Sequence, residues 1–169
     1  MRASVLILLT GLTLGAAACA TVDSASPSPP TPDASGTPAP IPGYDWFFHR
    51  DEAEARLVYG LAESDDMRLA LDCAQASGKL LLSALGEPGA RPEIHVESGG
   101  ETRRFPARSE PSQLHEGVFL TAEAAAGERV FQRFRGLGWM ALWRDGAREA
   151  YAPHPGSAAN IERFFAFCG

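Results

Sequence analysis

Three cysteines carry the most reactive side chains of this 169-residue chain, and they stand at positions 19, 73 and 168. Cys19 follows an apolar run over residues 5–14, which itself follows a single early cation, Arg2. An apolar run of about ten residues is typical of a secretory signal peptide and is too short to span a bilayer, which needs roughly 20 residues. The order of these features predicts export into an oxidising compartment.

The residues from Leu14 to Cys19 resemble the lipobox of bacterial lipoproteins, although the residue three places before the cysteine is Ala16 rather than a larger apolar one. The resemblance implies that the Cys19 thiol is joined to diacylglycerol, that the chain is cut just before it, and that the new amino group is acylated. Ala20 at the next position, rather than Asp, implies sorting to the outer membrane, on its periplasmic side. Several acyl chains make such an attachment stable. The alternatives are cleavage after Ala18 or Ala20 with secretion to the periplasm, and an uncleaved anchor.

The composition divides the chain into three parts. Residues 1–18 are predicted to be a signal peptide, residues 19–43 a lipidated tether, and residues 44–169 a single globular domain. The tether is rich in Pro, Ser and Thr, with seven prolines between Ala20 and Gly43. Such a segment buries too little apolar surface to offset its ordering entropy, so disorder is expected. In a polyproline II conformation, at roughly 3.1 Å per residue, it would reach about 75 Å.

Cys73 and Cys168 are each predicted to face the core, by independent patterns. Every second residue from Met67 to Cys73 is apolar, which is the period of a half-buried strand. Cys168 closes a helical pattern of apolar residues that begins at Ile161. With Cys19 assigned to lipid, we expect Cys73 and Cys168 to form a disulfide that pins the last helix to the sheet. The alternative is two buried free thiols.

Hydrophobic periodicity predicts a mainly β, α+β domain. Strands are expected over residues 44–49, 55–60, 67–74, 79–85, 93–97, 102–107, 118–122, 137–144 and 148–152. Helical spacing predicts a short helix from Val130 to a left-handed cap at Gly136, and a C-terminal helix capped by Ser157. The expected fold is an antiparallel β-sandwich or a partly open barrel with both helices packed on the sheet. The layout of the C-terminal part is similar to that of small periplasmic proteins of the invasion-associated locus B type.

The remaining polar residues predict little catalytic chemistry. The four histidines are scattered, without the spacing of metal ligands, and no metal site or cofactor is expected. His95 and Glu97 share a strand face, so a weak metal or acid–base pair is an alternative to a plain solvent-facing surface. The acidic loop over residues 63–66 is a further calcium candidate, with a solvated turn as the simpler interpretation. The sequence has no nucleophile-elbow motif, and we expect no enzyme activity.

Trp46, Trp139 and Trp143 are the candidate ligand-binding residues, because exposed indole rings stack on sugars or grip a hydrophobic peptide. Packing in the core is the alternative, since the strand over residues 137–144 is apolar on both faces. The net charge of −6 disfavours nucleic acid as a partner.

The expected function is therefore that of a lipid-anchored periplasmic domain. It would bind an envelope protein or a cell-wall component, or have a structural role in the envelope. The alternative is an inhibitor of an envelope-acting hydrolase such as a lysozyme or a protease. An inhibitor would present a protruding polar loop, expected at residues 97–101 or 108–115.

Overall fold

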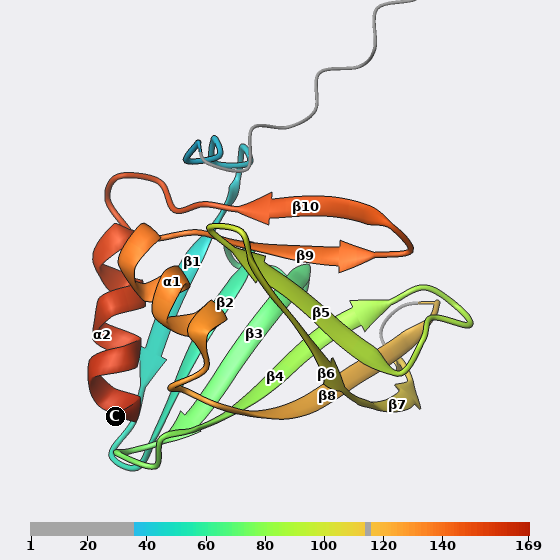
Figure 1. Cartoon of the computed structure of the whole chain (residues 1–169), viewed down its shortest axis with the longest axis horizontal. Helices are drawn as coiled ribbons and strands as arrows, with labels where there is room; N and C mark the ends of the chain where they lie inside the picture. The colour runs from blue at the N-terminus through green and yellow to red at the C-terminus, as the bar shows by residue number, and fades with distance from the viewer. Residues whose placement is uncertain (1–35, 114–115) are drawn as a thin grey trace, which may run out of the picture. The chain divides into compact units, whose positions relative to one another are not determined.

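The computed structural model describes residues 36–113 and 116–169 (Figure 1). Cys19, the predicted signal peptide and most of the predicted tether lie outside the described residues. No helix within the described part of the chain is long and apolar enough to cross a membrane. The described elements, in chain order, are β1 (Tyr44–Arg50), β2 (Glu54–Leu61), β3 (Met67–Ala74), β4 (Lys79–Gly86), β5 (Glu93–Ser98), β6 (Glu101–Pro106), β7 (Arg108–Pro111), β8 (Val118–Ala125), α1 (Arg129–Leu137), β9 (Met140–Arg144), β10 (Ala147–Tyr151) and α2 (Ala158–Cys168).

The strands form two antiparallel sheets that pack face to face (Figure 1). The larger sheet has six strands in the order β1-β2-β3-β4-β8-β7, and the smaller sheet has four in the order β10-β9-β5-β6. The sheets do not close into a barrel. The predicted α+β fold is therefore confirmed in its sandwich form.

Alternation along the strands builds the core between the sheets. In the larger sheet Leu57, Leu71 and Leu82 lie opposite one another in adjacent strands, and all three are fully buried. In the smaller sheet Val96 and Leu142 are paired across β5 and β9 and are buried in the same core. Because a slip of one residue would turn each of these side chains outward, the period of two specifies the register of both sheets.

Both helices pack on the core side of the sheets. Phe131 of α1 stacks on Phe105 of β6 with ring centroids 5.6 Å apart, and Phe134 lies 4.9 Å from Trp46 of β1. Phe165 of α2 packs edge-on against Phe134 at 5.8 Å. In Figure 1 neither helix is drawn over the outer side of β9 and β10.

The predicted disulfide is confirmed. Cys73 on β3 and Cys168 at the end of α2 are bonded, with their Cα atoms 5.8 Å apart, and both residues are buried. The backbone N–H of Gly78 donates to the carbonyl oxygen of Cys168 at 2.9 Å, and that of Ala76 donates to Phe167 at the same distance. The turn between β3 and β4 therefore holds the end of α2 by hydrogen bonds as well as by the bridge.

Two helix ends differ from the prediction. α1 continues through Gly136 and ends at Leu137. Its left-handed cap is Gly138, which has φ of 78° and donates its N–H to the carbonyl oxygen of Phe134. The strand that follows accordingly begins at Met140 rather than at residue 137. Ser157 precedes α2 as expected, but its hydroxyl makes no hydrogen bond to the helix amides and instead bonds to Asp45. The cap hydroxyl is used to join two distant segments.

Candidate functional site

Trp46 is a core residue. Its side chain is fully buried, and its Nε1 donates to the carbonyl oxygen of Tyr151 at 3.1 Å. The indole ring also contacts Tyr59 and Phe134, with centroids 5.2 and 4.9 Å away. Trp46 thus lacks the exposed face that ligand binding would need, and the packing interpretation fits its position.

Trp139 and Trp143 lie on the outer face of the smaller sheet, because they alternate with the core residues Met140 and Leu142. Trp139 is only 2% exposed and packs with a small second cluster of apolar residues around Ala141. Trp143 is only partly buried. Of the three predicted tryptophans, Trp143 is therefore the one whose ring is available to a ligand.

A carboxylate organises this outer face. Glu97 of β5 is 4% exposed, and the guanidinium of Arg148 holds it with two hydrogen bonds, from Nε to Oε2 at 2.9 Å and from Nη2 to Oε1 at 3.0 Å. Nε1 of Trp143 donates to the same Oε2 at 3.0 Å, and Arg148 lies over the ring of Trp139 at 5.4 Å. We call these four residues, together with His95, the Glu97 cluster.

The strand register explains how the cluster forms. Glu97 lies opposite Ala141, which lies opposite Ala150, while Arg148 lies opposite Trp143 in the neighbouring row. Arg148 on β10 must therefore cross β9 to reach Glu97 on β5. Because Ala141 is small, the strand in between leaves room for the long Arg148 side chain.

The hydrogen bonds decide the charge of Glu97. Burial alone would raise the pKa of Glu97, but the hydrogen bonds from Arg148 and Trp143 outweigh it and hold the pKa below its ordinary value. The side chains of the pair are 5% and 19% exposed, so the bidentate geometry offsets a real desolvation cost. Glu97 is consequently ionised at neutral pH with its oxygens occupied, which suits it to fixing its neighbours rather than to proton transfer.

His95 extends the cluster along the same row. Its ring lies 5.7 Å from that of Trp143 with an interplanar angle of 17°. Burial and then the nearby Arg104 guanidinium lower the pKa of His95, so the ring is neutral at neutral pH. His95 and Glu97 do share a strand face, but the carboxylate bonds to Arg148 and Trp143 rather than to the imidazole.

The metal alternatives find no support in the described residues. Within residues 36–113 and 116–169, no three His, Cys, Asp or Glu side chains lie close enough together to hold a metal ion. In the acidic loop, the carboxylate of Asp66 accepts a hydrogen bond from the Tyr44 hydroxyl and lies 3.4 Å from Nε of Arg68.

The two loops expected for an inhibitor are joined to strands where the structure describes them. Ser98 is fully buried and its hydroxyl donates to the carbonyl oxygen of Trp139 at 2.7 Å, so residues 97–101 form a tight hairpin turn. A Cβ added at Gly99 would lie 2.4 Å from the Leu137 side chain, which shows how closely this turn packs on α1. Arg108–Pro111 forms strand β7 and pairs with β8.

Sequence reasoning missed Arg148, which is central to the cluster. The turn signal at Asp145-Gly146 predicts a hairpin that places Arg148 opposite Trp143, and this part of the cluster was accessible from sequence. The contact with Glu97 depends on the pairing of β5 with β9, between strands far apart in the chain. No local sequence pattern predicts the register between β5 and β9.

Comparison with known proteins adds no identification: no family model matches the chain, and neither a curated protein nor a solved structure is significantly similar to it. The fold and the site define an α+β sandwich with an aromatic and ionic cluster on the outer face of the smaller sheet.

Proposed function

We propose that this chain is a lipid-anchored binding domain of the bacterial envelope, on the periplasmic side of the outer membrane, whose ligand is a sugar chain of the cell wall. The partly exposed ring of Trp143 carries the proposal, because it lies on a sheet face that no helix covers and its orientation is fixed. The role is one of binding rather than catalysis, since the Glu97 carboxylate is engaged on both oxygens.

A row of four side chains across the smaller sheet forms the binding surface. Arg104, His95, Trp143 and Arg148 lie opposite one another on β6, β5, β9 and β10. With strands about 4.8 Å apart, this row spans roughly 15 Å. The rings of His95 and Trp143 lie nearly parallel at its centre, and the exposed Arg104 guanidinium at one end offers hydrogen-bond donors. The Arg148 guanidinium is held by Glu97.

This arrangement suits a sugar better than a hydrophobic peptide. A sugar ring presents C–H groups on its face and hydroxyls at its edge, which match aromatic surface flanked by a few fixed polar groups. A hydrophobic peptide would need a wider apolar groove, whereas Trp143 is flanked by charged and small side chains. The predicted tether also supports a target that lies away from the bilayer.

Co-sedimentation of the mature protein with purified peptidoglycan tests the proposal. Trp143→Ala should weaken binding about tenfold or more, because a central aromatic anchor contributes much of a binding energy. Phe119→Ala is the matched control, since Phe119 is a partly buried aromatic residue of β8 in the other sheet. Equal binding by the wild type and Trp143→Ala, or no binding by the wild type, would refute the sugar ligand.

The envelope address has its own test. Cys19→Ala should abolish incorporation of a labelled fatty acid and release the protein from the membrane fraction. Cys73→Ser is the control, since Cys73 belongs to the disulfide and its substitution should leave labelling intact. Retention of label by Cys19→Ala would show that the anchor lies elsewhere.

A further inference from the structure

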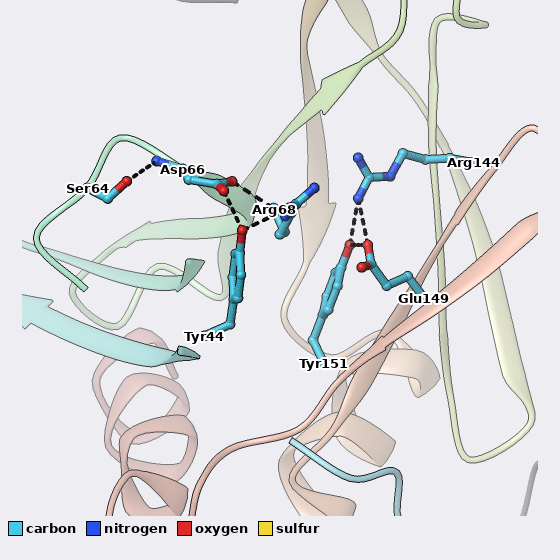
Figure 2. Close-up of polar contacts among 7 residues, drawn as sticks. All are labelled: Tyr44, Ser64, Asp66, Arg68, Arg144, Glu149 and Tyr151. Atoms are coloured by element: carbon cyan, nitrogen blue, oxygen red, sulfur yellow. Dashed lines mark hydrogen bonds and ion pairs between the residues drawn. The ribbon is translucent and has the colours of Figure 1, made fainter. Parts of the chain in front are cut away.

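Two triads of polar side chains face one another between the sheets (Figure 2). The Tyr44 triad comes from the larger sheet and its β2–β3 turn, and consists of Tyr44, Asp66 and Arg68. The Tyr151 triad comes from the β9–β10 hairpin of the smaller sheet, and consists of Arg144, Glu149 and Tyr151. Both lie apart from the Glu97 cluster, so the inference drawn from them is independent of the proposed function.

The triads have the same internal design. The hydroxyl of Tyr44 accepts a hydrogen bond from Nη2 of Arg68 at 2.8 Å and donates to the Asp66 carboxylate. In this triad the phenol and the carboxylate therefore lie along one edge of the guanidinium, which fixes the direction of its remaining N–H groups.

The Tyr151 triad repeats this pattern on the other side. The hydroxyl of Tyr151 accepts from Nη2 of Arg144 at 2.8 Å and donates to Oε2 of Glu149 at 2.9 Å. Burial raises the pKa of Tyr151, so its hydroxyl stays protonated and remains a donor.

A buried ring keeps the two triads apart. Tyr59 of β2 is fully buried and stacks on Tyr44 on one side and on Tyr151 on the other, with centroids 6.0 and 4.6 Å away. The triads therefore cannot close directly on each other. The hydrogen bond with Tyr44 raises the pKa of Arg68, and the charge of Glu149 in the other triad adds to this in the same direction.

The guanidiniums of Arg68 and Arg144 have N–H groups that no hydrogen bond within their triads uses. Figure 2 shows the side chains of Arg68 and Arg144 pointing toward one another. Among the described residues, Nη1 of Arg68 and both Nε and Nη1 of Arg144 have no hydrogen-bond partner. The two arginine side chains are 35% and 28% exposed, so a small solute can reach them.

We propose that the space between the two triads is a binding site for a small carboxylate, which Arg68 and Arg144 hold from opposite sides. A carboxylate presents two oxygens in one plane, which matches the forked N–H groups of arginine. Asp66 and Glu149 already offset the two guanidinium charges, so the site favours a singly charged anion over a doubly charged one.

Titration of the mature protein with sodium acetate tests this site, with the arginine Nε–H signals followed by NMR. We expect saturable shifts of the Arg68 and Arg144 signals in the millimolar range, as suits a ligand of four heavy atoms. Arg144→Lys keeps the charge but loses the fork, and half-saturation should need at least about tenfold more acetate. Arg133→Gln on α1 is the control and should bind like the wild type.

Other outcomes overturn the proposal. Shifts that sodium chloride reproduces at equal ionic strength would show general screening, and unsaturable shifts would show that no site exists. Tighter binding of inorganic phosphate than of acetate at pH 8 would contradict the preference for a single charge. Because the acetate site and the Trp143 surface have separate variants, loss of one result leaves the other intact.

Discussion

Two polar regions of the molecule differ in how their charged side chains are hydrogen-bonded. In the Glu97 cluster, one buried carboxylate accepts hydrogen bonds from Arg148 and Trp143 on both oxygens. At the two triads, the arginines retain unpartnered N–H groups, and the hydroxyl of Tyr59 is buried among the described residues without a hydrogen-bond partner. The backbone amide of Ile41 is near this hydroxyl without forming a hydrogen bond to it.

This difference suggests that the Glu97 cluster holds its side chains in place, whereas the two triads can bind a ligand. The Glu97 carboxylate has both oxygens hydrogen-bonded, and it holds the Trp143 ring in one orientation. An unpartnered buried hydroxyl costs stability, whereas the spare donors of the partly exposed guanidiniums bond to water, which a ligand can replace. We therefore expect the first region to respond strongly to mutation and the second to respond strongly to ligands.

The largest expected effect compares the two arginines directly. Arg148→Ala leaves the Glu97 carboxylate buried without its partner, and the free energy of unfolding should fall by about 3–5 kcal/mol. Arg144→Ala removes an arginine whose ion pair is far more exposed, and the loss should be about 1 kcal/mol or less. Urea denaturation measures both. Equal losses would mean that the two regions do not differ in this way.

A smaller effect of opposite sign is expected at Tyr59. Tyr59→Phe removes a buried hydroxyl that has no partner in the described structure and keeps the ring that separates the triads. The variant should be more stable than the wild type by about 1 kcal/mol, because the unpaired group no longer has to be desolvated. Thermal unfolding would show a higher midpoint. A clear loss of stability would indicate that the hydroxyl has a bonding partner in solution.

The smallest effects concern pH, and they lie at opposite ends of the scale. The pKa of Glu97 lies below its ordinary value of 4.5, so its contribution is fully present above that pH and is lost as the pH falls through the lowered pKa. Burial raises the pKa of Tyr151 above its ordinary value of 10.0, so its contribution is present below that pH and is lost as the pH rises.

Two variants test the loss of stability at acid pH and at alkaline pH separately. Glu97→Gln should flatten the acid limb of stability against pH, and Tyr151→Phe should flatten the alkaline limb. Urea unfolding over a series of pH values gives both curves. If Glu97→Gln keeps the acid limb of the wild type, other carboxylates are responsible for it.

Much of the fold follows from local periodicity. The alternation from Met67 to Cys73 and the helical spacing from Ile161 to Cys168 each place a thiol inward, and together they predicted the disulfide. The predicted cap of α1 at Gly136 was wrong, because a second glycine, Gly138, stands close by and the packing of the helix decides which one ends it. β7 was missed, because all four of its residues are exposed and give no apolar signal.

The candidate site was predictable only in part. Trp139 and Trp143 share one strand face, yet one is buried and the other is not, and the difference is the position of Arg148. That position depends on β5, β9 and β10 together. Pairing between strands that are far apart in the chain cannot be predicted from local sequence patterns. The placement of one triad opposite the other was hidden for a related reason, since each triad comes from a different sheet.

The bond between Cys73 and Cys168 encloses the chain from β4 to the end of α2 within one covalent ring. A protease that cuts once anywhere in this ring leaves both fragments attached to each other. The nicked molecule therefore migrates as a single band in electrophoresis until a reducing agent is added. Cleavage between β1 and β2 falls outside the ring and frees a fragment at once.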